Sequence, residues 1–125
     1  MSDDLHLFES AIDLLSFVSL EILTNRDWND VNYLSLAGVF KPKKDGTPMN
    51  TPIALSQYLK DRPYIKNIRL HLDNDYIGRA ATKALASSLL QGFSVINEPP
   101  IFGKDYNDQL RNRLDLFNPG KEHER

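Results

Sequence analysis

Acidic side chains recur in this sequence at the points where β-strands are expected to end. Glu9 directly follows one apolar segment, and an Asp-Asn-Asp run at 73–75 follows another. A further pair, Asp105 and Asp108, lies in the loop after the last expected strand, and Asp13 stands one helical turn beyond Glu9. Because ligands bind outside the carboxyl ends of strands in open parallel sheets, five or six carboxylates are expected to converge on one edge.

Such a concentration of negative charge favours bound cations. Carboxylates that lie close together repel one another, so gathering them is costly unless cations lie between them. Mg²⁺ is the expected ion, with Mn²⁺ as the alternative, because it takes carboxylate oxygens, keeps several waters and is often shared with a substrate phosphate. Two such ions can stabilise the attacking and leaving oxygens of a phosphoryl transfer. The pattern therefore indicates chemistry on phosphates.

Each of these acids also has a structural interpretation. Asp75 and Asp108 are each suited to cap the helix that follows, and Asp13 is suited to the solvated side of an amphipathic helix. Glu9 and Asp73 directly abut apolar strands, where no capping role explains a carboxylate, so function is the favoured interpretation for these two. Asp105 gains significance only together with its neighbours.

The elements that must position these acids alternate between strand and helix patterns. This alternation is typical of βα units, and it predicts an α/β fold with a central, mainly parallel sheet of about four strands and helices on both faces. Thr51 is expected to cap the second helix, with Pro52 at its first helical position. The strands are expected at 5–8, 33–36, within 65–72 and 93–96, and the helices at 10–25, 51–60, 77–91 and around 110–117.

The expected helix at 10–25 is apolar over most of its circumference. One stripe consists of Ala11, Leu14, Leu15, Val18 and Ile22, and further apolar residues lie off it, at Ile12, Phe17, Leu20 and Leu23. A helix of this kind is expected to be deeply buried or covered by a partner.

The totals are those of one ordinary domain, expected at 1–118 with a flexible polar tail at 119–125. The chain has no cysteine, which excludes disulfides, zinc ribbons and thiol nucleophiles. Its acidic start and the absence of a long apolar run predict a cytoplasmic protein without membrane contact. A net charge of −2 predicts weak binding of DNA or RNA by this chain alone. Further domains or partner proteins are expected to provide most of the affinity.

Three segments together resemble the Toprim domain of bacterial primases, type IA and type II topoisomerases, OLD-type nucleases and a recombination protein. They are Phe-Glu-Ser-Ala-Ile-Asp at 8–13, Leu-Asp-Asn-Asp-Tyr-Ile-Gly at 72–78 and Lys-Asp-Tyr-Asn-Asp at 104–108. Their spacing is most similar to the Toprim-2 group of primase-like and mobilisation proteins, as is the segment at 33–38. The resemblance extends from residue 5 to about 117, and it implies a Rossmann-like, three-layer Toprim domain.

The resemblance also implies a function and roles for particular residues. It implies a Mg²⁺-dependent module for nucleotidyl transfer or phosphodiester cleavage, incomplete on its own, within a primase-like or DNA-processing protein of a mobile element. Glu9 is the implied general acid or base, or a metal ligand, and Asp73 and Asp75 form the implied catalytic, magnesium-binding pair. Gly78 is implied to let the following helix pack tightly, whereas Ser10 stands where primases have a glycine.

The acids at 13, 105 and 108 are the further implied metal ligands, although the pair Asp105 and Asp108 is spaced one residue wider than in primases. The candidate nucleic-acid contacts are basic residues, each with the alternative of a solvated surface side chain: Arg79, Lys104, Lys41, Lys43 and Lys44.

Other interpretations stay open at this stage. The principal alternative is a non-catalytic Toprim-like scaffold that binds DNA or protein partners. A phosphatase-like domain with Asp73 as nucleophile is disfavoured, because Ile77 stands where such enzymes carry Thr or Ser. His6 and His71 are interpreted as structural, and Tyr76 is not expected to be a nucleophile.

Overall fold

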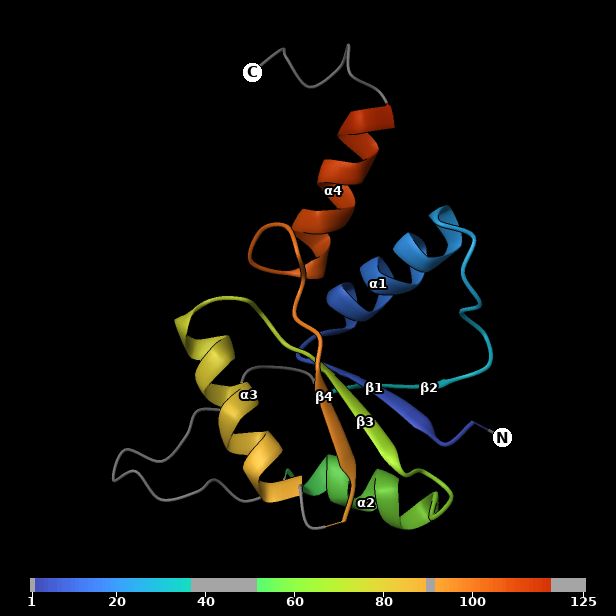
Figure 1. Cartoon of the computed structure of the whole chain (residues 1–125), viewed down its shortest axis with the longest axis vertical. Helices are drawn as coiled ribbons and strands as arrows, with labels where there is room; N and C mark the ends of the chain where they lie inside the picture. Colours follow the sequence, from blue (N-terminus) through green and yellow to red (C-terminus); the bar gives the residue numbers. More distant parts are fainter. Residues whose placement is uncertain (1, 37–51, 90–91, 118–125) are drawn as a thin grey trace.

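The computed structural model describes residues 2–36, 52–89 and 92–117, which form four strands and four helices in alternation (Figure 1). The expected βα order is confirmed. The boundaries shift by at most two residues, except that the last helix begins four residues before its expected start. In chain order the elements are β1 (Asp4–Phe8), α1 (Ala11–Leu23), β2 (Asn32–Ser35), α2 (Ile53–Asp61), β3 (Asn67–His71), α3 (Tyr76–Leu89), β4 (Ser94–Asn97) and α4 (Tyr106–Phe117).

All neighbouring strands of the sheet are parallel, in the order β2-β1-β3-β4. The chain passes from β1 outward to β2 and then crosses back to form β3 on the other side of β1. The strand order therefore reverses between β1 and β3, where Phe8 pairs with His71. The crevice at such a reversal is the usual ligand site of an open α/β sheet.

One face of the sheet packs against α2 and α3 through an apolar core. Side chains alternate along a strand, so every second residue of β1 and β3 points to this face. Its buried members are aliphatic: Leu5, Leu7, Leu55, Ile65, Ile68, Leu70, Leu85 and Leu89. Burial of these side chains provides most of the driving force for the fold.

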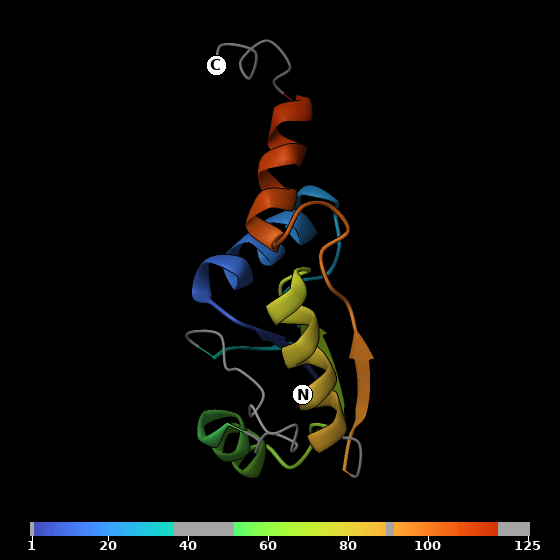
Figure 2. The same ribbon diagram turned by 90° about the vertical axis from the view of Figure 1, so that its left-hand side faces the viewer.

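The opposite face is partly covered by α1 and α4, and it is more polar. Phe8 packs there against Leu20 of α1 and Tyr106 of α4, while His6 and His71 lie between the same layers. Figures 1 and 2 show α1 and α4 side by side at one end of the molecule, with α2 at the opposite end. The helices on both faces confirm the three-layer α/β fold.

The orientation of α1 differs from the one its apolar stripe predicts. Its buried residues are Asp13, Ser16 and Leu20, whereas Leu15 is 60% exposed and Ile22 is 52% exposed. The polar residues face inward because Asp13 joins other carboxylates at the edge of the sheet and Ser16 donates a hydrogen bond to Asn107, 3.3 Å away. Deep burial of the whole helix is therefore wrong, and its coverage by a partner stays a prediction.

The start of α2 also differs from the sequence-based expectation. Pro52 lies at the N-cap with extended backbone angles and makes no side-chain cap, so it does not occupy the first helical position. Its carbonyl oxygen accepts the first helical hydrogen bond, from the N–H of Ser56 at 2.9 Å. The expected cap at Thr51, the lysines at 41, 43 and 44, and the tail at 119–125 lie outside the described residues. None of the helices within the described ranges has both the length and the apolar content that crossing a membrane requires.

Candidate metal centre

Three aspartates meet at the carboxyl edge of the sheet. Asp13 lies in the first turn of α1, Asp73 in the turn after β3 and Asp105 immediately before α4. One carboxylate oxygen from each lies within 4.8 Å of the others. Residues separated by 60 and 32 positions are thus brought together by the strand order, as the strand-end pattern predicts.

Glu9 adds a fourth carboxylate beside this trio. It follows β1 directly and is only 4% exposed. Its Oε1 accepts a hydrogen bond from the backbone N–H of Asp73 at 3.3 Å. Glu9 and Asp73 therefore lie on either side of the point where the strand order reverses.

Burial and mutual repulsion raise the pKa values of these acids. Burial is the main cause of the rise in the pKa of Asp73 to about 7, and the charges of Glu9, Asp13 and Asp105 add to it. The pKa values of Glu9 and Asp13 are also raised, again chiefly by burial. The charge of Lys104 lowers the pKa values of Asp73 and Asp13 but does not offset burial and repulsion, so the cluster stays short of positive charge.

Asp13 shows this shortage directly. Its Oδ2 accepts a hydrogen bond from the Ser10 hydroxyl at 3.1 Å, and its backbone N–H donates to the same hydroxyl oxygen at 3.3 Å. Its Oδ1 is buried without a hydrogen bond of good geometry among the described residues, although the backbone N–H of Asn107 lies near enough to the carboxylate to lower its pKa. A buried, unsatisfied carboxylate oxygen beside two further aspartates suits a hard cation that takes oxygen ligands, so these residues fit a divalent metal ion such as Mg²⁺.

Asp75 has a different position. It lies at the N-cap of α3, where its Oδ1 accepts a hydrogen bond from the N–H of Gly78 at 2.7 Å. It lies outside the trio whose oxygens approach within 4.8 Å, although its charge contributes to the raised pKa of Glu9. The structure thus gives Asp75 a capping contact and places it at the border of the cluster.

The loop before α4 is held by Asp105 and Asp108. Asp105 Oδ1 accepts from the N–H of Asp108 at 2.9 Å, so Asp105 caps the helix and the expectation of a cap at Asp108 is wrong. Asp108 Oδ2 instead accepts from the N–H of Lys104 at 3.0 Å. This pair of bonds fixes the loop that presents Asp105 to the other two aspartates.

A close backbone approach at Gly78 positions Asp73. A Cβ atom on Gly78 would collide with the carbonyl oxygen of Asp73 and would lie only 2.9 Å from the Cβ of that residue. The tight packing of the helix start that the motif implies is therefore confirmed. Only glycine lets the first turn of α3 fold back this closely on the end of β3.

Two candidate nucleic-acid contacts lie near the cluster. Arg79 is exposed, and its guanidinium donates to the backbone and side-chain oxygens of Asn74 at 3.3 and 3.2 Å. The ammonium of Lys104 is 3.9 Å from Asp105 Oδ2, and its side chain is 55% exposed. Both basic side chains lie at the edge of the carboxylate cluster. Lys43 and Lys44 lie outside the described residues.

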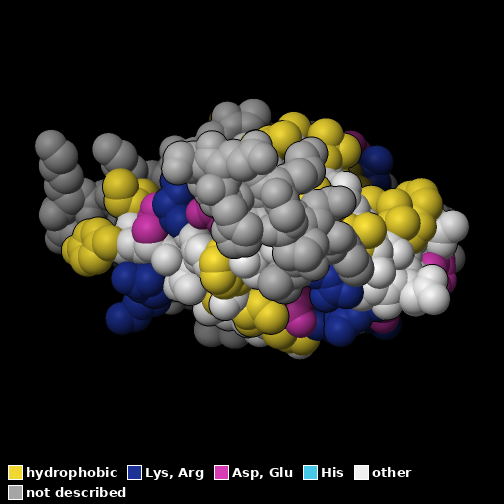
Figure 3. Space-filling view, turned by 90° about the horizontal axis from the view of Figure 1, so that it is seen from above, with side chains coloured by type: hydrophobic (Ala, Val, Ile, Leu, Met, Phe, Trp, Pro, Cys, Tyr) yellow, Lys and Arg dark blue, Asp and Glu magenta, His cyan; other side chains and the backbone are white. Residues whose placement is uncertain are grey.

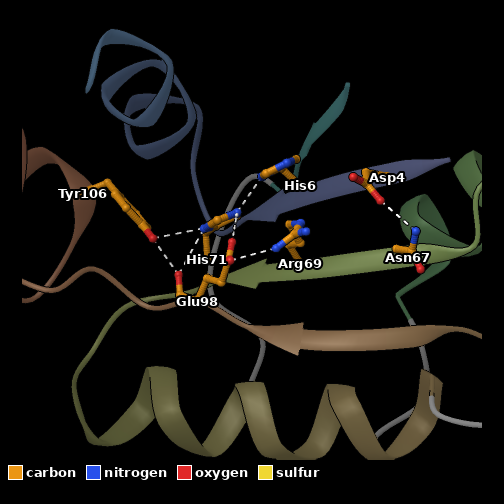
Figure 4. A network of polar contacts seen from close by, with 7 residues as sticks. All are labelled: Asp4, His6, Asn67, Arg69, His71, Glu98 and Tyr106. Carbon is orange, nitrogen blue, oxygen red and sulfur yellow. Dashed lines mark hydrogen bonds and ion pairs between the residues drawn. The ribbon is translucent and has the colours of Figure 1, made fainter. Parts of the chain in front are cut away.

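A second polar cluster consists of His6, His71 and Glu98 on the sheet face toward α1 and α4 (Figure 4). Glu98 is absent from the predicted site residues. Its sequence signal is the same as that of Glu9, because it directly follows the strand β4. The neighbouring Pro-Pro pair makes that acid look like an ordinary loop residue in the sequence.

The comparisons with known proteins agree with this geometry. A family model described as Toprim-like matches residues 6–110, which include the last three residues of β1, the other three strands and the acids at 9, 13, 73 and 105. No curated protein matches the chain.

Proposed function

The chain belongs to the Toprim-like family, and from this premise we propose that it is a Mg²⁺-dependent module for nucleotidyl transfer or phosphodiester cleavage. The family indicates a nucleic-acid-processing module. The observation that supports metal-dependent chemistry is the carboxylate cluster at the reversal of the strand order, with the raised pKa of Asp73 and the unsatisfied Oδ1 of Asp13. We further propose that the module is part of a primase-like or DNA-processing protein of a mobile element, because the segments at 33–38 and 104–108 resemble the Toprim-2 group of such proteins.

Asp13, Asp73 and Asp105 would hold the cation. When bound, a hard divalent ion supplies electrostatic stabilisation for charge that develops on phosphate oxygens. The three residues come from a helix start, a strand end and a loop that is fixed by its own hydrogen bonds. Side chains held in this way need little reorganisation during the reaction.

Glu9 is the proposed general acid or base. Its pKa is raised by burial and by the charges of Asp75 and Asp13, so it holds its proton nearer to neutral pH than an ordinary glutamate does. A catalytic acid or base works best when its pKa lies near the operating pH. Its contact with the backbone N–H of Asp73 keeps its carboxylate next to the proposed metal ligands.

The nucleic acid must be held largely by other domains or partners. The chain carries a net charge of −2, and affinity for nucleic acid comes mostly from neutralised phosphates. Figure 3 shows side chains of both charge signs interspersed among apolar ones on one face of the described part of the molecule. Arg79 and Lys104 are the proposed local phosphate contacts, because both are exposed beside the carboxylates.

Magnesium titration of the parent and of Asp73→Asn tests this function. The parent is expected to gain about 2.7 kcal/mol of unfolding free energy when Mg²⁺ reaches roughly 100 times its Kd, because the ion binds the folded state alone. Asp73→Asn should lose this gain, and also the Mg²⁺-dependent cleavage or extension of a labelled oligonucleotide. Without metal the variant should be as stable as the parent or more so, since it relieves repulsion without a change of shape.

The matched control is Asp30→Asn, which removes one charge from an exposed loop position. It should keep both the magnesium gain and the activity. The metal-site hypothesis is wrong if Asp73→Asn destabilises the metal-free protein while Mg²⁺ stabilises variant and parent alike. A parent chain that gains no stability from Mg²⁺ would instead favour the scaffold, which needs no metal ion at this edge of the sheet.

A further inference from the structure

The cluster of His6, His71 and Glu98 joins three segments of the sheet. His6 comes from β1, His71 is the last residue of β3, and Glu98 directly follows β4. His6 is 9% exposed and His71 is 1% exposed. One potential ligand atom from each of the three residues lies within 4.8 Å of the others, as Figure 4 shows for the side chains.

The hydrogen bonds around His71 decide which ring nitrogen carries its proton. The Tyr106 hydroxyl donates to the backbone carbonyl oxygen of Glu98 at 2.6 Å. Nδ1 of His71 is 3.0 Å from that carbonyl oxygen and 3.0 Å from the Tyr106 hydroxyl oxygen. Since the tyrosine proton is already donated and the carbonyl can only accept, Nδ1 of His71 must be the donor. Nε2 of the same ring therefore presents a lone pair.

That lone pair accepts a hydrogen bond from His6 and lies beside a carboxylate. Nε2 of His71 is 3.6 Å from Oε1 of Glu98 and 2.7 Å from Nδ1 of His6. Burial, as the main cause, lowers the pKa of His71 to about 3 and that of His6 to about 4, so both rings are neutral at pH 7. With both rings neutral, the Nδ1–H of His6 donates to Nε2 of His71, and Oε1 of Glu98 lies beside the same nitrogen without sharing a proton with it. A metal ion at Nε2 would replace the hydrogen bond from His6.

His71 and Glu98 each make a second hydrogen bond of the kind that usually holds a metal ligand in place. A metal-binding histidine typically donates its second N–H to a carbonyl or carboxylate, and Nδ1 of His71 donates to the Glu98 carbonyl. A ligating carboxylate is typically held by a further donor, and Arg69 donates to Oε2 of Glu98 at 2.8 Å. Both Oε1 of Glu98 and Nε2 of His71 are thereby oriented toward the same point.

Access to this point is open. His6 and Glu98 line a pocket of about 1100 Å³, together with Arg69, Phe17 and Tyr106. The side chain of Glu98 is 38% exposed, so an ion and its water can reach the carboxylate from this pocket. Three protein ligands and an open, solvent-facing position are the pattern of metal sites that keep one exchangeable ligand.

We propose that His6, His71 and Glu98 bind a transition-metal ion of the Zn²⁺ class, at a site separate from the carboxylate cluster. Two imidazole nitrogens and one carboxylate suit Zn²⁺ and similar ions, whereas Mg²⁺ prefers oxygen ligands alone. On binding, the His6 ring carries its proton on Nε2 and turns the Nδ1 lone pair to the ion, which replaces the hydrogen bond between the histidines. The ion links β1, β3 and the segment after β4.

The test is titration of the full chain with Zn²⁺ by calorimetry, and with Co²⁺ by visible absorption, in excess Mg²⁺ so that the carboxylate cluster is occupied. The parent should bind one equivalent with a Kd on the order of 1 µM or tighter. His6→Gln should abolish this binding. Glu98→Gln, whose partly exposed side chain keeps its shape, should weaken binding about 10-fold to 100-fold and change the Co²⁺ spectrum.

Two control variants separate this site from other sources of zinc binding. His123→Gln removes the third histidine of the chain, and Asp73→Asn removes the proposed magnesium ligand. Both should bind Zn²⁺ like the parent. The proposal is overturned if the parent does not bind Zn²⁺ or Co²⁺ in excess Mg²⁺, if Glu98→Gln and His6→Gln bind as tightly as the parent, or if either control variant loses the binding.

Discussion

Two polar clusters lie along and just beyond strands β1 and β3, and burial shifts their pKa values in opposite directions. In the carboxylate cluster, burial raises the pKa of Asp73 to about 7. In the histidine cluster, it lowers the pKa of His6 to about 4. Both shifts favour the neutral form of the buried group. The same low-dielectric setting keeps the histidines neutral and leaves the carboxylates dependent on a cation for full ionisation at neutral pH.

The clusters also differ in how far their own hydrogen bonds satisfy them. His71 contacts the Glu98 carbonyl and the Tyr106 hydroxyl through Nδ1 and His6 through Nε2, and Arg69 donates to the Glu98 carboxylate, so this cluster is largely connected within the protein. In the carboxylate cluster, Oδ1 of Asp13 is buried without a hydrogen bond of good geometry among the described residues. We therefore expect the metal-free protein to be destabilised chiefly at the carboxylates.

The largest expected effect comes from Gly78→Ala, which acts directly on the carboxylate cluster through Asp73. The added methyl group collides with the backbone of Asp73, so the end of β3 or the start of α3 must move. We expect a loss of about 3 kcal/mol in unfolding free energy, measured in urea, together with loss of magnesium stabilisation. Gly92→Ala is the control, because its methyl group meets nothing within 4 Å. Equal stability of the two variants would show that the close approach at Gly78 is unimportant.

A smaller effect concerns pH. In EDTA, the contributions of Asp73 and His6 to the free energy of unfolding should change with pH in opposite directions. The folded pKa of Asp73, about 7, lies above its ordinary value of 3.8, so the folded state keeps a proton that the unfolded state loses between these values. Its contribution to stability therefore falls as pH rises from about 4 to 7. The folded pKa of His6, about 4, lies below 6.5, so its contribution falls as pH drops from 6.5 to 4.

Urea unfolding across this range measures both slopes. Relative to the parent, Asp73→Asn should gain stability as pH rises from 4 to 7, and His6→Gln should gain stability as pH falls from 6.5 to 4. We expect each relative change to be about 1 kcal/mol after solvent screening. Parallel pH profiles of the parent and both variants would contradict the opposite protonation of the two clusters.

The smallest effect is expected at Asp75, and it decides whether this residue belongs to the carboxylate cluster or only caps α3. Asp75→Ala removes the cap on the N–H of Gly78 and should cost about 0.5 kcal/mol of unfolding free energy, since relief of repulsion at Glu9 offsets part of the lost cap. Asp75→Asn keeps a capping oxygen and should be nearly neutral. Loss of the magnesium gain in Asp75→Asn, read from thermal unfolding, would make Asp75 a ligand rather than a cap.

The sequence alone determined the order of the elements and the edge of the sheet at which the acids lie. Alternating βα patterns require a parallel sheet, and residues placed just after parallel strands must share one edge. Glu9 and Asp73 were predictable for this reason, because each directly abuts an apolar strand. Gly78 was predictable from its motif, and the structure shows the close approach that requires it.

Only the tertiary structure decided which side chains meet. The order β2-β1-β3-β4 depends on long-range pairing, and it brought Asp13, Asp73 and Asp105 together while Asp75 and Asp108 made local hydrogen bonds. Periodicity could not give the rotation of α1, because apolar residues surround that helix and the positions of Asp13 and Ser16 were settled by partners far away in the chain. The contact of His6, His71 and Glu98 arose in the same way, since it joins three segments whose proximity only the folded sheet creates.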